Sequence, residues 1–250
     1  MAPLSKNSTL SQLKNGLIVS CQPGIGSALD RPQFVAAMAS VAEEQGAVGL
    51  RIRATRNIRA VRRAVQVPII GIEKINDPGS AVYITPTLQS VLRVYRAGAQ
   101  IIALDGTERP RPNGQSLAEI IKAARSSLDA LIMADVATLQ QGIEAARLGV
   151  DMVGTTLYGY TEETKHCTGP GFDLARDLVR EIDIPVIMEG RLHHPDDVRR
   201  AFDLGVYAVV VGTAITDIEW KVRRFIEACP NDGKSPRRVS SGPRSWKSKS

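Results

Sequence analysis

The stretch GAQIIALD, residues 98–105, combines the two features that decide the fold of this chain. Its end, QIIALD, is a short apolar run without polar alternation, as in a strand buried on both faces of a parallel sheet. Its start, Gly98-Ala99, is a turn that closes a segment of helical periodicity. The same turn, a glycine followed by a small apolar residue, recurs at Gly46, Gly149 and Gly205.

Seven further apolar runs complete a set of eight. The eight runs are GLIVSCQ (16–22), AVGLRI (47–52), PIIGIEK (68–74), QIIALD (100–105), LIMAD (131–135), DMVGTT (151–156), PVIMEG (185–190) and YAVVVG (207–212). The glycine turns lie 52, 51 and 56 residues apart and lead into every second run. Four copies of a two-strand unit predict a closed (β/α)8 barrel, a TIM barrel, as a single domain over residues 1–229. An open doubly wound sheet fits less well, because no GxGxxG follows the first run.

Amphipathic segments alternate with these runs and predict about eight helices. One begins near Asp30 and Pro32 and carries Phe34, Met38 and Val41 on a common apolar face. A second begins at Pro195, with Val198, Ala201 and Phe202 together.

The positive charge of the chain belongs mainly to its end. The net charge is +6, but residues 230–250 hold six Lys/Arg against one Asp, so the first 229 residues carry only about +1. This Ser- and Pro-rich stretch is predicted to be a disordered basic tail, for which a solvated extension is favoured over a nucleic-acid-binding arm.

Composition excludes several other classes of protein. The sequence contains no run of about 18 apolar residues, so no membrane span is predicted. The N-terminal segment does not resemble a secretory signal. Three scattered cysteines, Cys21, Cys167 and Cys229, fit neither a disulfide framework nor a zinc site. A cytoplasmic location without membrane or metal is therefore expected.

The carboxyl ends of the eight runs predict the active site, since barrel enzymes place their chemistry there. These ends are Gln22, Arg51, Lys74, Asp105, Asp135, Thr155, Glu189 and Gly212, and seven of the eight are polar or charged. Lys74 and Glu189 end runs three and seven, which face each other across an eight-strand ring. A lysine acting as a base needs desolvation or a cationic neighbour such as Arg51. The alternative for Lys74 and Glu189 is a structural ion pair.

The loops after runs seven and eight predict a phosphate site. They read EGRLHHPDD (189–197) and VGTAITD (211–217), and Gly190 and Gly212 permit close approach of main-chain N–H groups to an anion. His193 and His194 are adjacent and point apart, so they do not predict a metal site.

Nine motifs in collinear order resemble the N-acetylmannosamine-6-phosphate 2-epimerase family. They are LIVSCQ (17–22), AVGLRI (47–52), PIIGIEK (68–74), VYITPT (82–87), IIALDGTERPRP (101–112), MADVAT (133–138), GTTLYGYT (154–161), EGR (189–191) and VVGTAIT (210–216). The resemblance extends over residues 13–228, nearly the whole predicted barrel.

The resemblance implies a cofactor-free epimerase that interconverts N-acetylmannosamine 6-phosphate and N-acetylglucosamine 6-phosphate in amino-sugar and sialic acid breakdown. It implies that Lys74 moves the C2 proton and that Glu189 is the second catalytic residue. The implied substrate-binding residues are Gln22, Arg51 and Asp135, to which the strand-end argument adds Thr155. The implied phosphate-binding residues are Gly190, Arg191, Gly212 and Thr213. The implied partner is a phosphosugar, and a homodimer is a candidate assembly.

Two positions depart from the family pattern. Asp217-Ile218 stands where family members usually carry Arg-Pro, so an acid that faced the phosphate would repel it. Glu73 stands where an apolar residue is usual, and strand alternation points it away from the side of Lys74.

Three other functions stay open at this stage. They are a metal-dependent pentulose-phosphate epimerase, an aldolase that forms a Schiff base on Lys74, and an inactive barrel that senses phosphosugars.

Overall fold

The computed structural model describes residues 5–230. The predicted basic tail falls almost wholly on residues 231–250, outside the described part, so its disorder stays a prediction.

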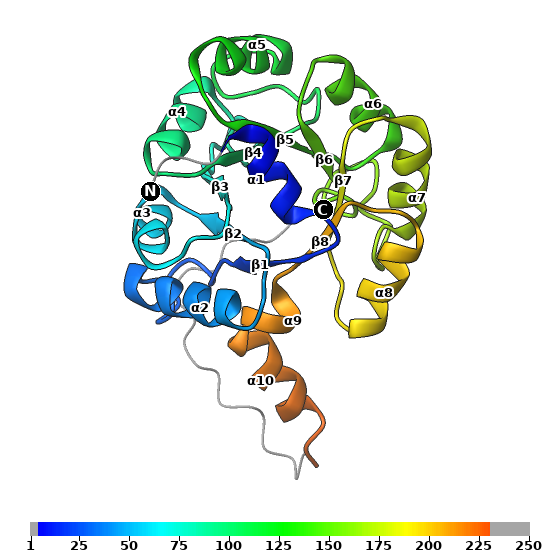
Figure 1. Cartoon of the computed structure of the whole chain (residues 1–250). Coiled ribbons are helices and arrows are strands. Elements are labelled where there is room, and N and C mark those ends of the chain that lie inside the picture. Colours follow the sequence, from blue (N-terminus) through cyan, green and yellow to red (C-terminus); the bar gives the residue numbers. More distant parts are fainter. Residues whose placement is uncertain (1–4, 231–250) are drawn as a thin grey trace.

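Eight parallel strands close into a barrel in chain order, with β1 hydrogen-bonded to both β2 and β8 (Figure 1). The strands are β1 (Leu17–Cys21), β2 (Gly49–Arg53), β3 (Ile69–Ile72), β4 (Ile101–Asp105), β5 (Leu131–Asp135), β6 (Met152–Gly154), β7 (Val186–Glu189) and β8 (Ala208–Val211). The prediction of a (β/α)8 barrel is therefore confirmed.

Helices α2 to α8 alternate with the strands and surround the barrel (Figure 1). They are α2 (Pro32–Glu44), α3 (Thr55–Ala64), α4 (Leu88–Arg96), α5 (Leu117–Ser127), α6 (Leu139–Arg147), α7 (Phe172–Glu181) and α8 (Pro195–Asp203). A short helix α9 (Thr213–Thr216) and a longer α10 (Ile218–Glu227) follow β8, and α10 projects away from the barrel (Figure 1). Within residues 5–230, no helix combines the length and apolar character needed to cross a membrane.

Helix α1 (Lys6–Leu13) covers the amino end of the barrel (Figure 1). Its Leu13 is fully buried against the apolar cluster inside the barrel, and Leu10 packs on the same cluster. The hydroxyl of Tyr207 also donates to the Leu10 carbonyl at 3.0 Å. With that end closed by apolar side chains, only the carboxyl end of the barrel is left for a site.

Strand alternation divides the core into two layers. The inner layer fills the barrel with side chains such as Ile18, Ile70, Met133 and Ile187. The outer layer packs the opposite strand faces, such as Leu50 and Ile52 from β2, against the surrounding helices. Most strands are apolar on both faces, which is why most runs lack polar alternation; β2 is the exception, with Arg51 and Arg53 on its inward face.

The predicted apolar face of α2 is correct at Met38, which packs against the outer core, and wrong at Phe34 and Val41. Phe34 and Val41 are 41% and 58% exposed, whereas Val35 and Ala39 are buried against the sheet. Position i and position i+1 differ by about 100° around a helix, so a face chosen one residue off points largely to solvent. The face predicted for α8 is confirmed: Ala201 is buried, and Val198 and Phe202 pack against the outer core.

Candidate active site

Charged side chains enter the barrel because they continue the inward positions of the strands. Arg51 and Arg53 of β2 pair with Ile70 and Ile72 of β3, which belong to the inner layer. Glu189 follows the inner residue Ile187 by two positions. Polar groups in these places lie at the carboxyl end, above the last apolar layer.

Arg51 stands at the centre of this end, with 1% of its surface exposed. Its Nη1 lies 3.1 Å from Asp135 Oδ1, and its Nη2 lies 2.5 Å from Oδ2. The same Nη1 lies 3.1 Å from Glu189 Oε2. One guanidinium therefore joins carboxylates from β5 and β7, a bidentate arrangement that fixes all three side chains.

Thr156 completes this cluster. Its hydroxyl lies 2.7 Å from Asp135 Oδ1 and 3.0 Å from Glu189 Oε2. The strand-end argument had selected Thr155, which is fully buried; its hydroxyl donates to the Glu189 carbonyl and accepts from the Glu189 N–H. The side chain of Thr155 therefore joins β6 to β7, and the position offered to a substrate is Thr156. Met152 belongs to the inner layer, and every second residue of a strand faces the same side, so Thr156 and not Thr155 continues the inward face.

Lys74 lies two residues beyond β3, on a segment that is held from both sides. The Ile75 N–H donates to the Tyr83 carbonyl at 3.0 Å, and the Thr85 N–H donates to the Glu73 carbonyl at 2.7 Å. Lys74 itself forms an antiparallel bridge with Ile84. The chain thus folds back on itself after β3 and fixes the lysine at the barrel mouth.

The side chain of Lys74 is exposed at the barrel mouth, while protein atoms lie around its amine and partly exclude water from it. This loss of hydration, reinforced by the charges of Arg51 and Arg53, lowers the pKa of Lys74 to about 8, against the opposing effect of Glu189 and Asp135. No ion pair within 4.0 Å joins Lys74 to Glu189 in the described residues, where Glu189 pairs with Arg51 instead. The lysine is thus within reach of its neutral form at mild pH, as a base requires.

Two further groups at the mouth have altered acidity. Burial raises the pKa of Glu189; Arg51 opposes this shift and Asp135 adds to it. Burial, with Asp135 and Asp105 in the same direction, raises the pKa of Tyr83. Glu189 is therefore suited to carry a proton, and Tyr83 stays a neutral phenol. The sequence argument missed Tyr83, because it follows no strand.

Gln22 extends the site on the side of β1. Its Nε2 donates to Ser20 Oγ at 2.8 Å, while its buried Oε1 has no hydrogen-bond partner in the described structure. An unpartnered amide oxygen is a costly group to bury, so it offers an acceptor for a ligand hydroxyl or amide.

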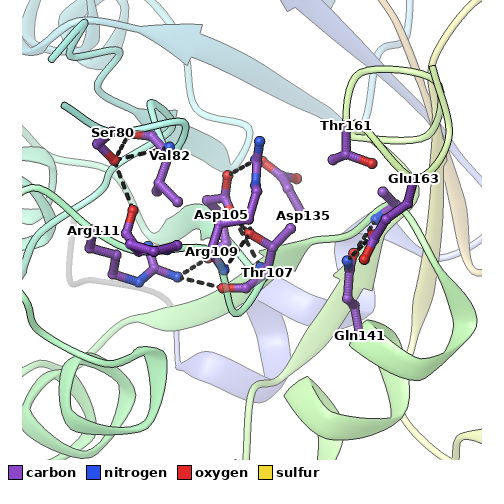
Figure 2. Close-up of polar contacts among 12 residues, drawn as sticks. Ser80, Val82, Asp105, Thr107, Arg109, Arg111, Asp135, Gln141, Thr161 and Glu163 are labelled. Atoms are coloured by element: carbon purple, nitrogen blue, oxygen red, sulfur yellow. Dashed lines mark hydrogen bonds and ion pairs between the residues drawn. The ribbon is translucent and has the colours of Figure 1, made fainter. Parts of the chain in front are cut away.

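Asp105 ends β4 directly beside Asp135 of β5 (Figure 2). Its carboxylate accepts from the Thr107 hydroxyl at 2.6 Å and pairs with Arg109 at 2.7 Å. The Arg111 guanidinium donates to the Asp105 carbonyl at 2.6 Å (Figure 2). Asp105 therefore organises the loop between β4 and α5.

The two glycines of the predicted phosphate loops have different surroundings. Gly190 has φ 121°, in the region that favours glycine, and a Cβ there would meet only the Thr155 carbonyl, at 4.0 Å. A Cβ at Gly212 would instead come within 3.1 Å of Ser20, so this glycine is packed against the end of β1. Gly212 precedes α9, whose first residue is Thr213. Space beside the main chain is therefore found at Gly190, while Gly212 is needed for internal packing.

The side chain of Arg191 contacts the loop between β6 and α7. Its guanidinium donates to the carbonyls of Cys167 at 2.7 Å and Gly159 at 3.0 Å, and it lies 4.7 Å from the centre of the Tyr160 ring. These contacts hold the loop, and the role of Arg191 toward a phosphate stays a prediction.

The two departures from the family pattern both turn away from the cluster. Asp217 Oδ1 accepts from the Trp220 N–H at 2.9 Å and caps α10. Glu73 pairs with Arg93 of α4 at 2.7 Å, outside the barrel, as strand alternation predicted. Among residues 5–230, no group of three or more His, Cys, Asp or Glu side chains is arranged to hold a metal ion.

Comparisons with known proteins agree on one family. A family model described as "Putative N-acetylmannosamine-6-phosphate epimerase" matches residues 35–231. A relative from Synechococcus elongatus, described as "Putative N-acetylmannosamine-6-phosphate 2-epimerase", is 44% identical over 227 residues, which are 90% of this chain and 98% of the relative. A relative of the same description from Cutibacterium acnes is 46% identical over 209 residues, 83% of this chain and 90% of that protein.

Solved structures extend the comparison to three dimensions. The N-acetylmannosamine-6-phosphate 2-epimerase from Clostridium perfringens superposes with a TM-score of 0.86 at 38% identity, covering 92% of this chain and all of that one. A thiamine phosphate pyrophosphorylase from Pyrococcus furiosus, with a TM-score of 0.56 at 17% identity, shares the fold alone. On the match of the family model and of relatives along nearly their whole length, this chain belongs to the N-acetylmannosamine-6-phosphate epimerase family.

Proposed function

We propose that this chain inverts C2 of N-acetylmannosamine 6-phosphate to give N-acetylglucosamine 6-phosphate, with Lys74 carrying the C2 proton. As a member of its family the chain is an epimerase, an isomerase of amino-sugar phosphate metabolism. The observation that supports the mechanism is a lysine with a pKa of about 8, fixed at the mouth beside the Arg51–Asp135–Glu189 cluster.

The reaction needs an acidic C2 proton, which the closed sugar ring does not have. Opening the ring moves a proton from the C1 hydroxyl to the ring oxygen and creates an aldehyde at C1. Glu189 suits this step, because a carboxyl with a raised pKa can hold the proton that a sugar oxygen gains. Thr156, within 3.0 Å of Glu189, orients that carboxyl.

The neutral amine of Lys74 then takes the C2 proton and becomes an ammonium group. The electron pair moves onto the C1 oxygen as an enolate, and the Arg51 guanidinium provides positive charge at this end of the barrel. The enolate then presents its other face after rotation about the C2–C3 bond, and the Lys74 ammonium donates its proton there, which gives the epimer and leaves the lysine neutral again. No cofactor is needed, because the aldehyde of the substrate itself accepts the electron pair.

The phosphate of the substrate is proposed to bind the main-chain N–H groups of Gly190, Arg191, Gly212 and Thr213. The open surroundings of Gly190, whose φ of 121° favours glycine, support this placement. It requires no side-chain cation from Arg191, which is engaged with the loop between β6 and α7.

The proposal is tested by incubating the protein with N-acetylmannosamine 6-phosphate in D₂O and following C2 by NMR. We expect N-acetylglucosamine 6-phosphate to form with deuterium at C2. Lys74→Ala is expected to retain the fold by circular dichroism and to lose at least about 100-fold in turnover, as for a positioned acid–base group. Turnover of Lys74→Ala above about 1% of wild type would remove Lys74 from this role.

Two of the alternatives give different results in the same assay. A metal-dependent epimerase would lose activity on exhaustive chelation and regain it with a divalent ion. An aldolase would be trapped on Lys74 by borohydride in the presence of substrate.

The proposed setting is a homodimer in the cytoplasm. The free thiols of Cys21, Cys167 and Cys229 are compatible with a reducing compartment. The exposed apolar face of α10 supports association with a second copy.

A further inference from the structure

A second guanidinium lies at the barrel mouth besides that of Arg51. Arg53 is the last residue of β2 and is only 8% exposed. Its strand partner is Ile72 of the inner layer, and Lys74 follows Ile72 by two positions. Arg53 and Lys74 therefore occupy neighbouring inward positions at the ends of adjacent strands.

The guanidinium of Arg53 is fixed from the side of the loop between β1 and α2. Its Nη2 donates to the Pro23 carbonyl at 2.7 Å and lies 3.0 Å from Asp30 Oδ2. The Asp30 side chain is 5% exposed and also accepts from Asn57 Nδ2 at 3.3 Å. That Asn57 amide donates to the Arg53 carbonyl at 3.1 Å as well. A network this closed leaves the side chain of Arg53 little freedom to move.

The backbone after Arg53 is constrained too. Ala54 has φ 73°, in the left-handed region that an L side chain rarely adopts, and its N–H donates to the Ile72 carbonyl at 2.9 Å. Ala54 directly follows β2. Its hydrogen bond reaches β3 at Ile72, two residues before Lys74. Backbone strain of this kind persists where the surroundings enforce it, often at functional sites.

The charged side chains that act on Lys74 come from β2, β5 and β7. The two arginines of β2 differ in the number and place of their acidic partners. Arg51 of β2 is balanced by Asp135 of β5 and Glu189 of β7. Arg53 has its counter-charge, Asp30, in the loop between β1 and α2. Tyr83, whose carbonyl accepts from the Ile75 N–H beside Lys74, is a neutral phenol because its pKa is raised.

We propose that Arg53 is a positioning residue for the proton carrier: its fixed positive charge favours the neutral form of the Lys74 amine, the form that accepts a proton. The proposal rests on the proposed function, in which Lys74 is that carrier. The direction of the effect agrees with the contribution of Arg53 to the lowered pKa of Lys74.

The test measures the pKa of Lys74 directly, by NMR titration of protein labelled with ¹³C-lysine, with the resonance assigned by its loss in Lys74→Ala. In Arg53→Gln the pKa of Lys74 is expected to rise by about one unit, as for removal of a nearby like charge. The kcat/KM should then fall about tenfold at pH 7 and approach the wild-type value above the new pKa. Arg53→Lys, which keeps the positive charge, should keep both the pKa of Lys74 and kcat/KM at pH 7 close to their wild-type values.

Arg56→Gln is the matched control. Arg56 pairs with the same Asp30 carboxylate at 3.0 Å, but its side chain is 58% exposed, so solvent screens its charge. Its replacement should leave the pKa of Lys74 and the pH profile of kcat/KM unchanged.

Asp30→Asn distinguishes an effect of the Arg53 charge on Lys74 from an effect of disordering the loop between β1 and α2. It removes the counter-charge of Arg53, so the pKa of Lys74 should fall, in the direction opposite to that in Arg53→Gln. Disordering of the loop would instead move both variants in the same direction and would overturn the proposal, as would an unchanged pKa in Arg53→Gln. If the pKa of Lys74 moves as expected but the pH profile does not follow, this inference stands and the role of Lys74 in the proposed function fails.

Discussion

Two neighbouring threonines after β6 differ in role because they point to opposite sides of the same strand. Thr155 points outward from the barrel interior and holds the main chain of β7 through two hydrogen bonds. Thr156 points inward and touches the carboxylates of Asp135 and Glu189. Both are threonines in the same motif, so only the inward direction distinguishes a substrate-site residue from a structural one.

Replacing each threonine by valine tests this difference with equal changes in volume. Thr156→Val loses hydrogen bonding to charged groups worth about 1.5–3 kcal/mol, so kcat/KM should fall roughly 10- to 100-fold at little cost in stability. Thr155→Val should instead lower the free energy of unfolding by about 1–3 kcal/mol, because it leaves buried main-chain groups unpaired. Steady-state kinetics and urea denaturation of both variants measure these effects. Equal kinetic losses in the two variants would contradict the assignment.

Much of the site follows from the sequence because parallel strands end together. Arg51, Asp135 and Glu189 come from three separate runs, and they meet as the strand-end argument expected. The contacts of Arg191 could not be foreseen, since they depend on how the loop between β6 and α7 folds back over it. Arg53 was overlooked because the predicted run ended at Ile52, one residue short of the strand.

At the scale of single elements, the connection between β3 and α4 shows where prediction from periodicity fails. Residues 73–75 and 83–85 pair by main-chain hydrogen bonds over an intervening loop, and Thr85 adopts φ 43° to do so. Neither segment has an extended apolar pattern of its own. The pairing comes from tertiary contacts, including the Asp105 N–H donating to the Ile84 carbonyl. This pairing positions Lys74 at the mouth.

Helix α10 begins at the capping residue Asp217, which gives a second prediction at this scale. Asn caps a helix about as well as Asp, whereas Ala loses the cap at a cost of about 1 kcal/mol. Asp217→Asn should therefore keep the thermal stability, and Asp217→Ala should lower it. Because the carboxylate turns toward the Trp220 N–H, KM for the phosphorylated sugar should change less than twofold in Asp217→Asn at low salt. A several-fold fall in KM that disappears as salt rises would show instead that this charge repels the phosphate.

For the molecule as a whole, the sequence predicts the eightfold alternation of strands and helices because most strands contribute apolar side chains to both layers of the core. The sequence does not predict the helices outside that repeat. Helix α1 has a weakly apolar sequence, and it closes the barrel through a few residues such as Leu13. Helix α10 is amphipathic, yet none of its residues is buried in the single chain.

The apolar side of α10 is the largest feature that the single chain leaves uncovered. Ile218, Val222, Phe225 and Ile226 are 53%, 49%, 77% and 52% exposed, at the spacing of one helical stripe. Contiguous exposed apolar stripes of this kind mark sites of association. The helix projects from the barrel (Figure 1), so its apolar stripe is accessible to a second copy.

If a second copy covers this stripe, Phe225→Glu should weaken self-association strongly. A buried aromatic side chain at an interface is typically worth about 2 kcal/mol or more, which corresponds to a dissociation constant raised about 30-fold. Sedimentation equilibrium over a range of concentrations measures that change, and Arg223→Glu, on another side of the same helix, is the control for added acidic charge. Since Phe225 is 77% exposed in the described chain, Phe225→Glu should also leave the thermal unfolding of the barrel itself nearly unchanged. A wild-type chain that stays monomeric at every concentration would mean that the stripe meets something other than a second copy.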